Sequence, residues 1–448
     1  MNAKTIIAFI VPILATTCAY GRFIYTESGN LSGTLTDGVW TLAATRARNT
    51  NNLTVNGSSG SFSGSAQSAL DLTEIFSDDG ETQYHAVTFQ TVPASAKAYL
   101  SAFIAPDCKE IKSSSFQGCT ALTDVQLNAS VTRIENQAFL SCSALASFYP
   151  RTLEVTYIYA KTFQGCSKLD GAFNLPNCTL IDNYAFNGCA LLESVTAPVA
   201  TTIRDAVFTG CTHLTTVYMP SVQQISNQAF QSCTSLGGDA VRGLLNRKIT
   251  LLGNNAIANQ KYIFLSCTSL SGEIEWNFPL LQTNVVAQSM FQNCTSLTGV
   301  NFVTDVAEIK DNAFKEIAPG AEVHMPLKVP VVYGSGSVCR QTAPYPKVYL
   351  KGNFEDWLAA MSRVNHVILR EEFNDTGWSH TYGSDTRGWA VITNKMASDS
   401  TMCTKTAVDG VTTVTVPDKK VIAFVMLGGD AGCWVLREPR KGTTIMVQ

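Results

Sequence analysis

The sequence is poor in charge. Asp, Glu, Lys and Arg make up 15% of its 448 residues, whereas about 25% is usual for globular proteins. The formal net charge is -3, and the lysines and arginines are scattered along the chain. Nucleic-acid binding requires basic side chains gathered on one face, so the sequence argues against a nucleic-acid partner. Gly, Ser, Thr and Asn fill the polar positions instead, which favours an extracellular protein.

Catalytic and metal-binding patterns are also missing. The chain has five histidines, and none lies at a metal-binding spacing or beside a Ser or Cys motif of nucleophilic catalysis. Its 14 cysteines include no C-x-x-C pair of the kind that converges on zinc. Gly334 and Gly336 lack the strand and helix that flank a phosphate-binding loop. The sequence therefore predicts no catalytic, cofactor-binding or metal-binding residue, and a protein that is not an enzyme.

Only the N-terminus has the pattern of a targeting segment. Lys4 precedes an apolar run over residues 6–14, and small residues up to Ala19 offer a cleavage site. This layout predicts a secretory signal peptide over residues 1–19. An alternative makes Cys18 a lipidated first residue. No later apolar run is long enough to cross a bilayer, so we expect a secreted or cell-surface protein without a transmembrane span.

One motif recurs along the middle of the chain, at intervals that are mostly 22 to 24 residues. Its first copy reads FQGCTAL and its last full copy reads FQNCTSL. The copies begin at Phe116, Phe139, Phe163, Phe186, Phe208, Phe230, Phe264 and Phe291, and Phe314 begins a decayed copy without cysteine. An isoleucine or valine stands five residues before most of these phenylalanines.

The period predicts a solenoid. A repeat of about 23 residues forms one coil, and a single coil cannot bury its own apolar face. Stacking the coils places each Phe over the next to form a buried spine. A Leu and a short strand-forming stretch follow each cysteine, as in residues 192–198 and 214–220. These stretches are expected to pair edge to edge into a parallel sheet, with side chains alternating between core and solvent.

These residues closely resemble the BspA-like leucine-rich-repeat family, whose units read roughly I-x-x-x-A-F-x-x-C-x-x-L-x-x-V-x-L-P. The resemblance covers about residues 98–370, and it is specific because the motif recurs in register. It implies an α/β fold, a leucine-rich-repeat solenoid with a parallel β-sheet on one face and short helices or turns on the other. The family occurs on secreted and cell-surface proteins and is associated with adhesion and protein binding. Residues 237–260 and 273–277 depart from the pattern as insertions expected to bulge out.

Composition changes on either side of the repeats predict further segments. Residues 20–97 are rich in Gly, Ser, Thr and Asn with alternating strand-like runs, and we expect a β-rich segment leading into the first coil. Residues 371–448 are expected to form a small β-rich domain. At the end of the array, the stretch from Val348 resembles a terminal strand followed by a short helix capped by Asn353.

Eight cysteines occupy one repeat position. Equivalent side chains of stacked coils point in parallel, whereas a disulfide needs Cβ atoms aimed at each other, so an inert ladder of buried thiols is favoured over disulfides or metal. Cys403 and Cys433, outside the repeats, form a better candidate pair, and either oxidation state fits the sequence. The repeat cysteines are Cys119, Cys142, Cys166, Cys189, Cys211, Cys233, Cys267 and Cys294.

The candidate functional surface is the outward side of the repeat sheet. Tyrosine gives contact area and amides give directional hydrogen bonds, so the strip suits a protein or glycan on a cell or matrix surface. We expect an adhesin; the alternative is a structural spacer in a surface layer without a specific ligand. The expected binding positions are Gln126, Tyr149, Asn174, Thr196, Tyr218, Asn277 and Asn301. A second row comprises Asp124, Ser147, Ser194, Thr216 and Glu275.

Overall fold

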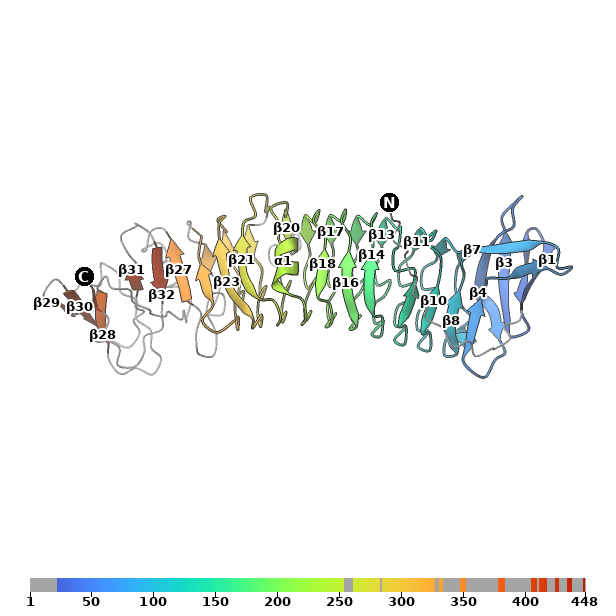
Figure 1. Ribbon diagram of the computed structural model, residues 1–448, viewed down its shortest axis with the longest axis horizontal. Coiled ribbons are helices and arrows are strands. Elements are labelled where there is room, and N and C mark those ends of the chain that lie inside the picture. Colours follow the sequence, from blue (N-terminus) through green and yellow to red (C-terminus); the bar gives the residue numbers. More distant parts are fainter. Residues whose placement is uncertain are drawn as a thin grey trace, which may run out of the picture.

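The computed structural model describes residues 22–253, 261–282, 284–326 and 330–332. The coils stack on one another into a long rod (Figure 1). Beyond residue 332 the structure describes the strands β27 (Lys347–Lys351), β28 (Trp378–Tyr382), β29 (Thr404–Val408), β30 (Val411–Val416), β31 (Phe424–Met426), β32 (Cys433–Leu436) and β33 (Met446–Val447). The expected signal peptide, the expected cap helix and Cys403 lie outside the described residues.

Sheet 1 is the row of strands along one side of the rod, with one strand from almost every coil, and its strand pairing is interrupted after Tyr149 and after Tyr218. Its strands are parallel because successive coils run in the same direction, and their side chains alternate between core and solvent. The central apolar residues, such as Val125 and Val195, are buried, as the sequence predicted. The strands are β8 (Leu100–Ile104), β10 (Asp124–Gln126), β12 (Ser147–Tyr149), β14 (Gly171–Asn174), β16 (Leu192–Thr196), β18 (Thr216–Tyr218), β21 (Gly272–Trp276), β23 (Leu297–Phe302), β25 (Glu322–His324) and β27.

Sheet 2 is the row of two-residue strands along another side, and its strand pairing is interrupted after Ile134 and after Leu252. The second residue of each strand is mostly the buried Ile or Val that precedes the repeat Phe, and it pairs in parallel with its counterpart, as Ile181 does with Ile203. The strands are β9 (Glu110–Ile111), β11 (Arg133–Ile134), β13 (Tyr157–Ile158), β15 (Leu180–Ile181), β17 (Thr202–Ile203), β19 (Gln224–Ile225), β20 (Leu251–Leu252), β22 (Val285–Val286), β24 (Glu308–Ile309) and β26 (Val331–Val332).

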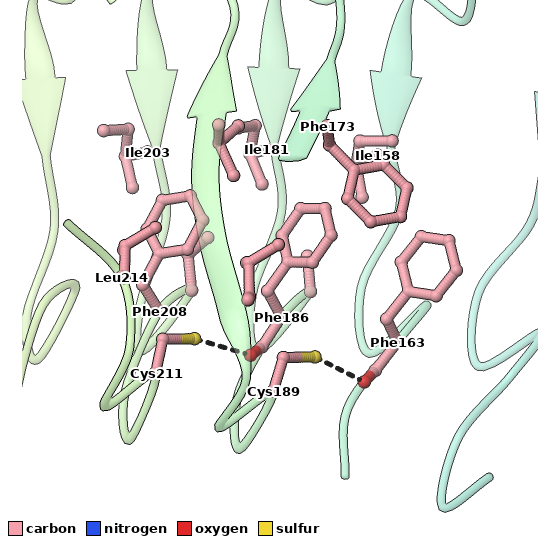
Figure 2. Close-up of a cluster of buried hydrophobic side chains, with 14 of the residues drawn as sticks. Ile158, Phe163, Phe173, Ile181, Phe186, Cys189, Ile203, Phe208, Cys211 and Leu214 are labelled. Carbon is pink, nitrogen blue, oxygen red and sulfur yellow. Dashed lines mark hydrogen bonds between the residues drawn. The ribbon is translucent and has the colours of Figure 1, made fainter. Parts of the chain in front are cut away.

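The predicted phenylalanine spine is confirmed. Phe163, Phe186 and Phe208 are fully buried. The ring centroid of Phe186 lies 5.4 Å from that of Phe163 and 5.7 Å from that of Phe208, and the three ring planes are nearly parallel (Figure 2). Within the described residues the stack begins at Phe89, one coil before the first motif copy, and extends to Phe314.

Left-handed residues shape the corner that carries this spine. The second residue before each repeat Phe and the second residue after it have φ between 53° and 76°. This explains why Gly, Ser or Asn mostly precedes the cysteine, because glycine and asparagine tolerate such a conformation best. The backbone N–H of each Phe donates to a carbonyl of the next coil, as Phe186 does to Val207 at 3.0 Å.

The expected parallel sheet and turns are therefore confirmed, whereas the α/β class and the alternative of short helices on this side are wrong. A right-handed helix does not continue through left-handed residues, so the corner consists of turns. The chain forms a β-solenoid of about ten turns with parallel sheets and almost no helix. Among the described residues the only α-helix is α1 (Gly238–Leu244), which lies between β18 and β21 (Figure 1).

Seven strands precede the first coils: β1 (Phe23–Gly29), β2 (Ser32–Thr36), β3 (Trp40–Arg46), β4 (Asn52–Phe62), β5 (Ser68–Asp71), β6 (Ile75–Ser77) and β7 (Gln83–Phe89). β6 pairs with both β1 and β7, so the order β7-β4-β3-β2-β1-β6 closes on itself. β7 then pairs with β9 of sheet 2, and β5 pairs with β8 of sheet 1. The ring thus covers the apolar end of the first coil, as a solenoid requires, and one hydrophobic core runs from Phe23 to Met325.

Candidate functional site

The outward face of sheet 1 carries the predicted strip in short rows. In the first row Gln126 lies opposite Tyr149. In the second row Thr196 lies between Asn174 and Tyr218. Tyr149 and Tyr218 are 62% and 55% exposed, as predicted. The residues that precede them on their strands, Phe148 and Val217, are buried in the core. Asn174 is exposed, whereas Gln126 and Thr196 are half-buried.

The two rows do not join. Asn174 does not pair with Tyr149 but forms an isolated β-bridge with Thr152. The Thr152 hydroxyl also accepts a hydrogen bond from the Asn174 side-chain amide at 3.4 Å. Arg151 marks this break, because its guanidinium pairs with Asp170 at 2.8 Å and lies 5.3 Å from the ring centroid of Phe173. A single continuous row from Tyr149 to Tyr218 is therefore absent from the described sheet.

The predicted register is also wrong at β21. Residues 273–277 do not form a bulging insertion, because Gly272–Trp276 is the sheet 1 strand of that coil. Asn301 lies opposite Glu275, which the sequence analysis had placed in the second row. Asn277 follows the strand, and its amide donates to the Glu275 carboxylate at 2.8 Å. The error is a shift of two residues, which keeps the side chain on the same face but moves it along the strand.

The face has an uneven charge that the sequence analysis did not identify. Between β8 and β25, the strands of sheet 1 contain no lysine or arginine. They contain five carboxylates, Asp124, Glu193, Glu273, Glu275 and Glu322. The strand sequences alone carried this signal, but it becomes a surface property only when stacking places the strands side by side.

A pocket of about 380 Å³ lies on the same face between α1 and β21. It is lined by Glu273 and Glu275 with Ile274 and Leu245 as buried apolar residues, and by Arg242. The guanidinium of Arg242 is held by the carbonyl oxygen of Ser271 at 2.9 Å and the carboxylate of Asp239 at 2.6 Å.

Glycine allows α1 to approach this strand closely. A Cβ on Gly238 would lie 1.9 Å from the carbonyl oxygen of Ser271, and one on Gly272 would lie 2.8 Å from the Arg242 guanidinium. Any larger residue at position 238 would push the helix away from β21. The sequence predicts this region only as an insertion, and no motif in it indicates the pocket.

The repeat cysteines form a buried ladder, as predicted. Each thiol from Cys142 to Cys294 lies 3.0 to 3.1 Å from the carbonyl oxygen of the preceding coil's Phe, as Cys211 does from Phe186 (Figure 2). Burial raises the pKa of the Cys119 and Cys267 thiols to about 12. Since the thiolate is the nucleophile and metal ligand, the ladder suits packing rather than chemistry.

A second aromatic group lies on the sheet 2 side, where no binding residue was predicted. Tyr157 is 43% exposed and Tyr184 36%. Arg133 and Lys161 lie over the rings of Tyr159 and Tyr184, at 5.6 and 5.7 Å from the centroids. These cations occupy ring faces that a ligand would otherwise contact.

Within the described ranges, no group of three or more His, Cys, Asp or Glu side chains could hold a metal ion. No helix in the same ranges has the length and apolar character needed to cross a bilayer.

Stacked coils with a buried Phe spine and a solvent-facing parallel sheet define a leucine-rich-repeat solenoid. The chain belongs to the BspA type leucine rich repeat region family, whose profile matches six copies over residues 96–214 and 179–320, half of the chain.

Among solved structures, the chain is similar to a leucine rich repeat protein of T. pallidum, with 24% sequence identity and a TM-score of 0.37. The match covers 46% of this chain and 93% of that chain. It is similar to a leucine-rich repeat protein from Bacteroides ovatus, with 17% identity, coverage of 66% and 89%, and a TM-score of 0.38. A leucine rich cell surface protein from Faecalibacterium prausnitzii has 18% identity, coverage of 73% and 97%, and a TM-score of 0.35. No curated protein matches the chain.

Proposed function

We propose that the protein is a secreted or cell-surface adhesin that binds a protein or glycan through the outward face of sheet 1. The exposure of Tyr149 and Tyr218 carries this proposal. Large aromatic side chains on a strand normally pack, and these two are more than half exposed on a sheet whose other outward positions are mostly polar, with Ile104 and Ala172 among the exceptions. Tyrosine supplies contact area at low entropic cost and a hydroxyl for hydrogen bonding, which is why it is enriched at interfaces.

The setting of these tyrosines favours binding over catalysis. Their neighbours Asn174 and Thr196 offer an amide and a hydroxyl group, which form directional hydrogen bonds to a partner. α1 stands beside β18, next to the row that ends at Tyr218, and the Arg151–Asp170 pair separates that row from the row of Tyr149. The two tyrosines are thus several strands apart, at about 4.8 Å for each strand, which suits an extended partner better than a small molecule.

The test is a binding screen of the purified protein on arrays of glycans and matrix proteins, followed by Tyr149→Ala/Tyr218→Ala. The double variant is expected to weaken binding to the partner found by more than about 2 kcal/mol, the threshold of an interface hot spot. Its melting temperature should be almost unchanged because both rings are exposed. Tyr157→Ala/Tyr184→Ala removes two rings from the sheet 2 side and serves as the matched control.

Two results would contradict the proposal. Binding that survives the sheet 1 variant and is lost in the sheet 2 control would move the recognition surface to the other side of the rod. A protein that binds nothing on either array would favour the alternative of a structural spacer.

A further inference from the structure

We propose that the pocket between α1 and β21 receives a lysine or arginine side chain, so that the partner of sheet 1 is a basic polypeptide segment. This inference rests on the proposed function, because it assigns the chemistry of the partner that the same face binds. It follows from the shape of the pocket, from its lining and from the charge of the surrounding strands.

The lining of the pocket matches the two parts of a basic side chain. Leu245 offers the apolar side chain of the lining, whereas Ile274 points into the core and lines the pocket only from beneath. An aliphatic stem would pack against Leu245, since lysine and arginine pack their methylene groups on apolar surface while the charged end stays polar. Glu273 and Glu275 lie two residues apart on β21, on the same face of the strand. Their carboxylates therefore face the charged end of a side chain that enters the pocket.

The positive charge already in the pocket does not neutralise these carboxylates. Arg242 pairs with Asp239 and donates to the Ser271 carbonyl oxygen. Across the part of the chain described here, no ion pair joins Glu273 or Glu275 to a lysine or arginine. The carboxylates are thus available to a cation from outside the molecule.

The surrounding face extends the same preference. Five carboxylates and no lysine or arginine lie on the sheet 1 strands from β8 to β25. By contrast, the outward residues of sheet 2 have both signs, with Glu110, Arg133 and Glu308 among them. A charge of one sign on one face attracts a partner of the opposite sign and repels anionic polymers. An anionic glycan therefore fits sheet 1 less well than a basic peptide.

The test uses two fluorescein-labelled peptides, one alternating lysine with serine and the other alternating glutamate with serine, and follows fluorescence anisotropy. The full chain is expected to bind the lysine peptide saturably and the glutamate peptide not at all. Raising the ionic strength from about 0.01 to 0.15 M shortens the Debye length from about 30 to 8 Å and should weaken binding.

Variants locate the interaction. Glu273→Gln/Glu275→Gln is expected to weaken lysine-peptide binding at least about tenfold. Glu74→Gln/Glu81→Gln removes the same charge from exposed positions before the first coils and should leave binding unchanged. Glu273→Lys/Glu275→Lys should transfer the preference to the glutamate peptide. Equal binding by the pocket and control variants, or no saturable binding to the lysine peptide, would overturn the proposal.

The outcome is separable from that of the proposed function. If a partner from the arrays depends on Tyr149 and Tyr218 but not on Glu273 and Glu275, the face binds and the pocket assignment fails. If the lysine peptide binds through the pocket while no array partner depends on the tyrosines, the pocket stands and the adhesin proposal fails.

Discussion

Replacing Phe186 with alanine removes one ring from the middle of the phenylalanine spine. The side chain is fully buried, and its ring lies 5.4 Å from Phe163, 5.6 Å from Phe173 and 5.7 Å from Phe208. Truncating a core phenylalanine costs about 3–5 kcal/mol in total, and this total includes the loss of its aromatic pairs, each worth about 0.5–1.5 kcal/mol beyond area burial. Because Phe186 loses three pairs, we expect a decrease in the upper half of that range, about 4–5 kcal/mol, in the free energy of unfolding.

Phe314→Ala is the matched variant at the end of the stack. Phe314 is equally buried, but among the described residues its ring has two aromatic neighbours, Phe291 at 5.9 Å and Phe302 at 6.1 Å. Its loss is expected to cost about 1 kcal/mol less than the loss of Phe186. Urea unfolding followed by circular dichroism gives both values.

A local measurement supplements the global one, because repeat arrays depart from two-state unfolding. The Cys211 thiol lies 3.1 Å from the Phe186 carbonyl oxygen, so the cavity left by Phe186→Ala should speed alkylation of Cys211 in the native state while that of Cys119 stays slow. Mass spectrometry locates the label. A variant within about 1 kcal/mol of the parent, with unchanged protection of Cys211, would refute the spine as the main stabilising element.

Two further predictions concern the thiols and the corner. Burial raises the pKa of Cys119 and Cys267 from 9.0 to about 12. The stabilising contribution of these buried thiols is therefore present below pH 9 and is lost as the pH rises from 9 towards 12. The urea concentration at the unfolding midpoint should fall over this pH range, and it should fall less in Cys267→Ala. A midpoint that rises with pH would contradict this. Gly188 has φ +74° with no atom closer than 3.8 Å to an added Cβ, so Gly188→Val should cost about 1–2 kcal/mol through backbone strain. Gly188→Asn should cost less, since Asn293 holds the equivalent position; equal melting temperatures for the two variants would contradict the conformational explanation.

The repeat pattern was sufficient to predict the spine, the buried cysteines and the strands of sheet 1. Each of these depends on a residue type recurring in register, and stacking makes every copy repeat the same environment. Phe186 is buried for the reason that Phe163 and Phe208 are buried, so one sequence period predicts many contacts. The same logic placed Tyr149 and Tyr218 on the outward face.

Features without a repeat were predicted less well. Short helices stayed open beside turns on the spine side because the motif gives no sign that Tyr184 or Gln228 adopts a left-handed conformation. The register of β21 was misjudged because outward positions were counted back from the closing proline, and Pro279 lies two residues farther from the buried Ile274 than Pro220 lies from Val217. The ring of strands before the first coils depends on pairings between β1, β6 and β7, which lie far apart in the chain and leave no periodic signal.

The sequence by itself determined that this chain is a solenoid, because a period of about 23 residues with one buried Phe, Cys and Leu per copy has no other way to bury its apolar residues. Only the tertiary structure decided the candidate site. Arg242 and Glu273 are separated by an insertion, and they line one pocket because Gly238 lets α1 pack against β21. Likewise, the five carboxylates of four strands come to lie on one face only when the coils stack, since electrostatic attraction depends on distance in space and not on distance along the chain.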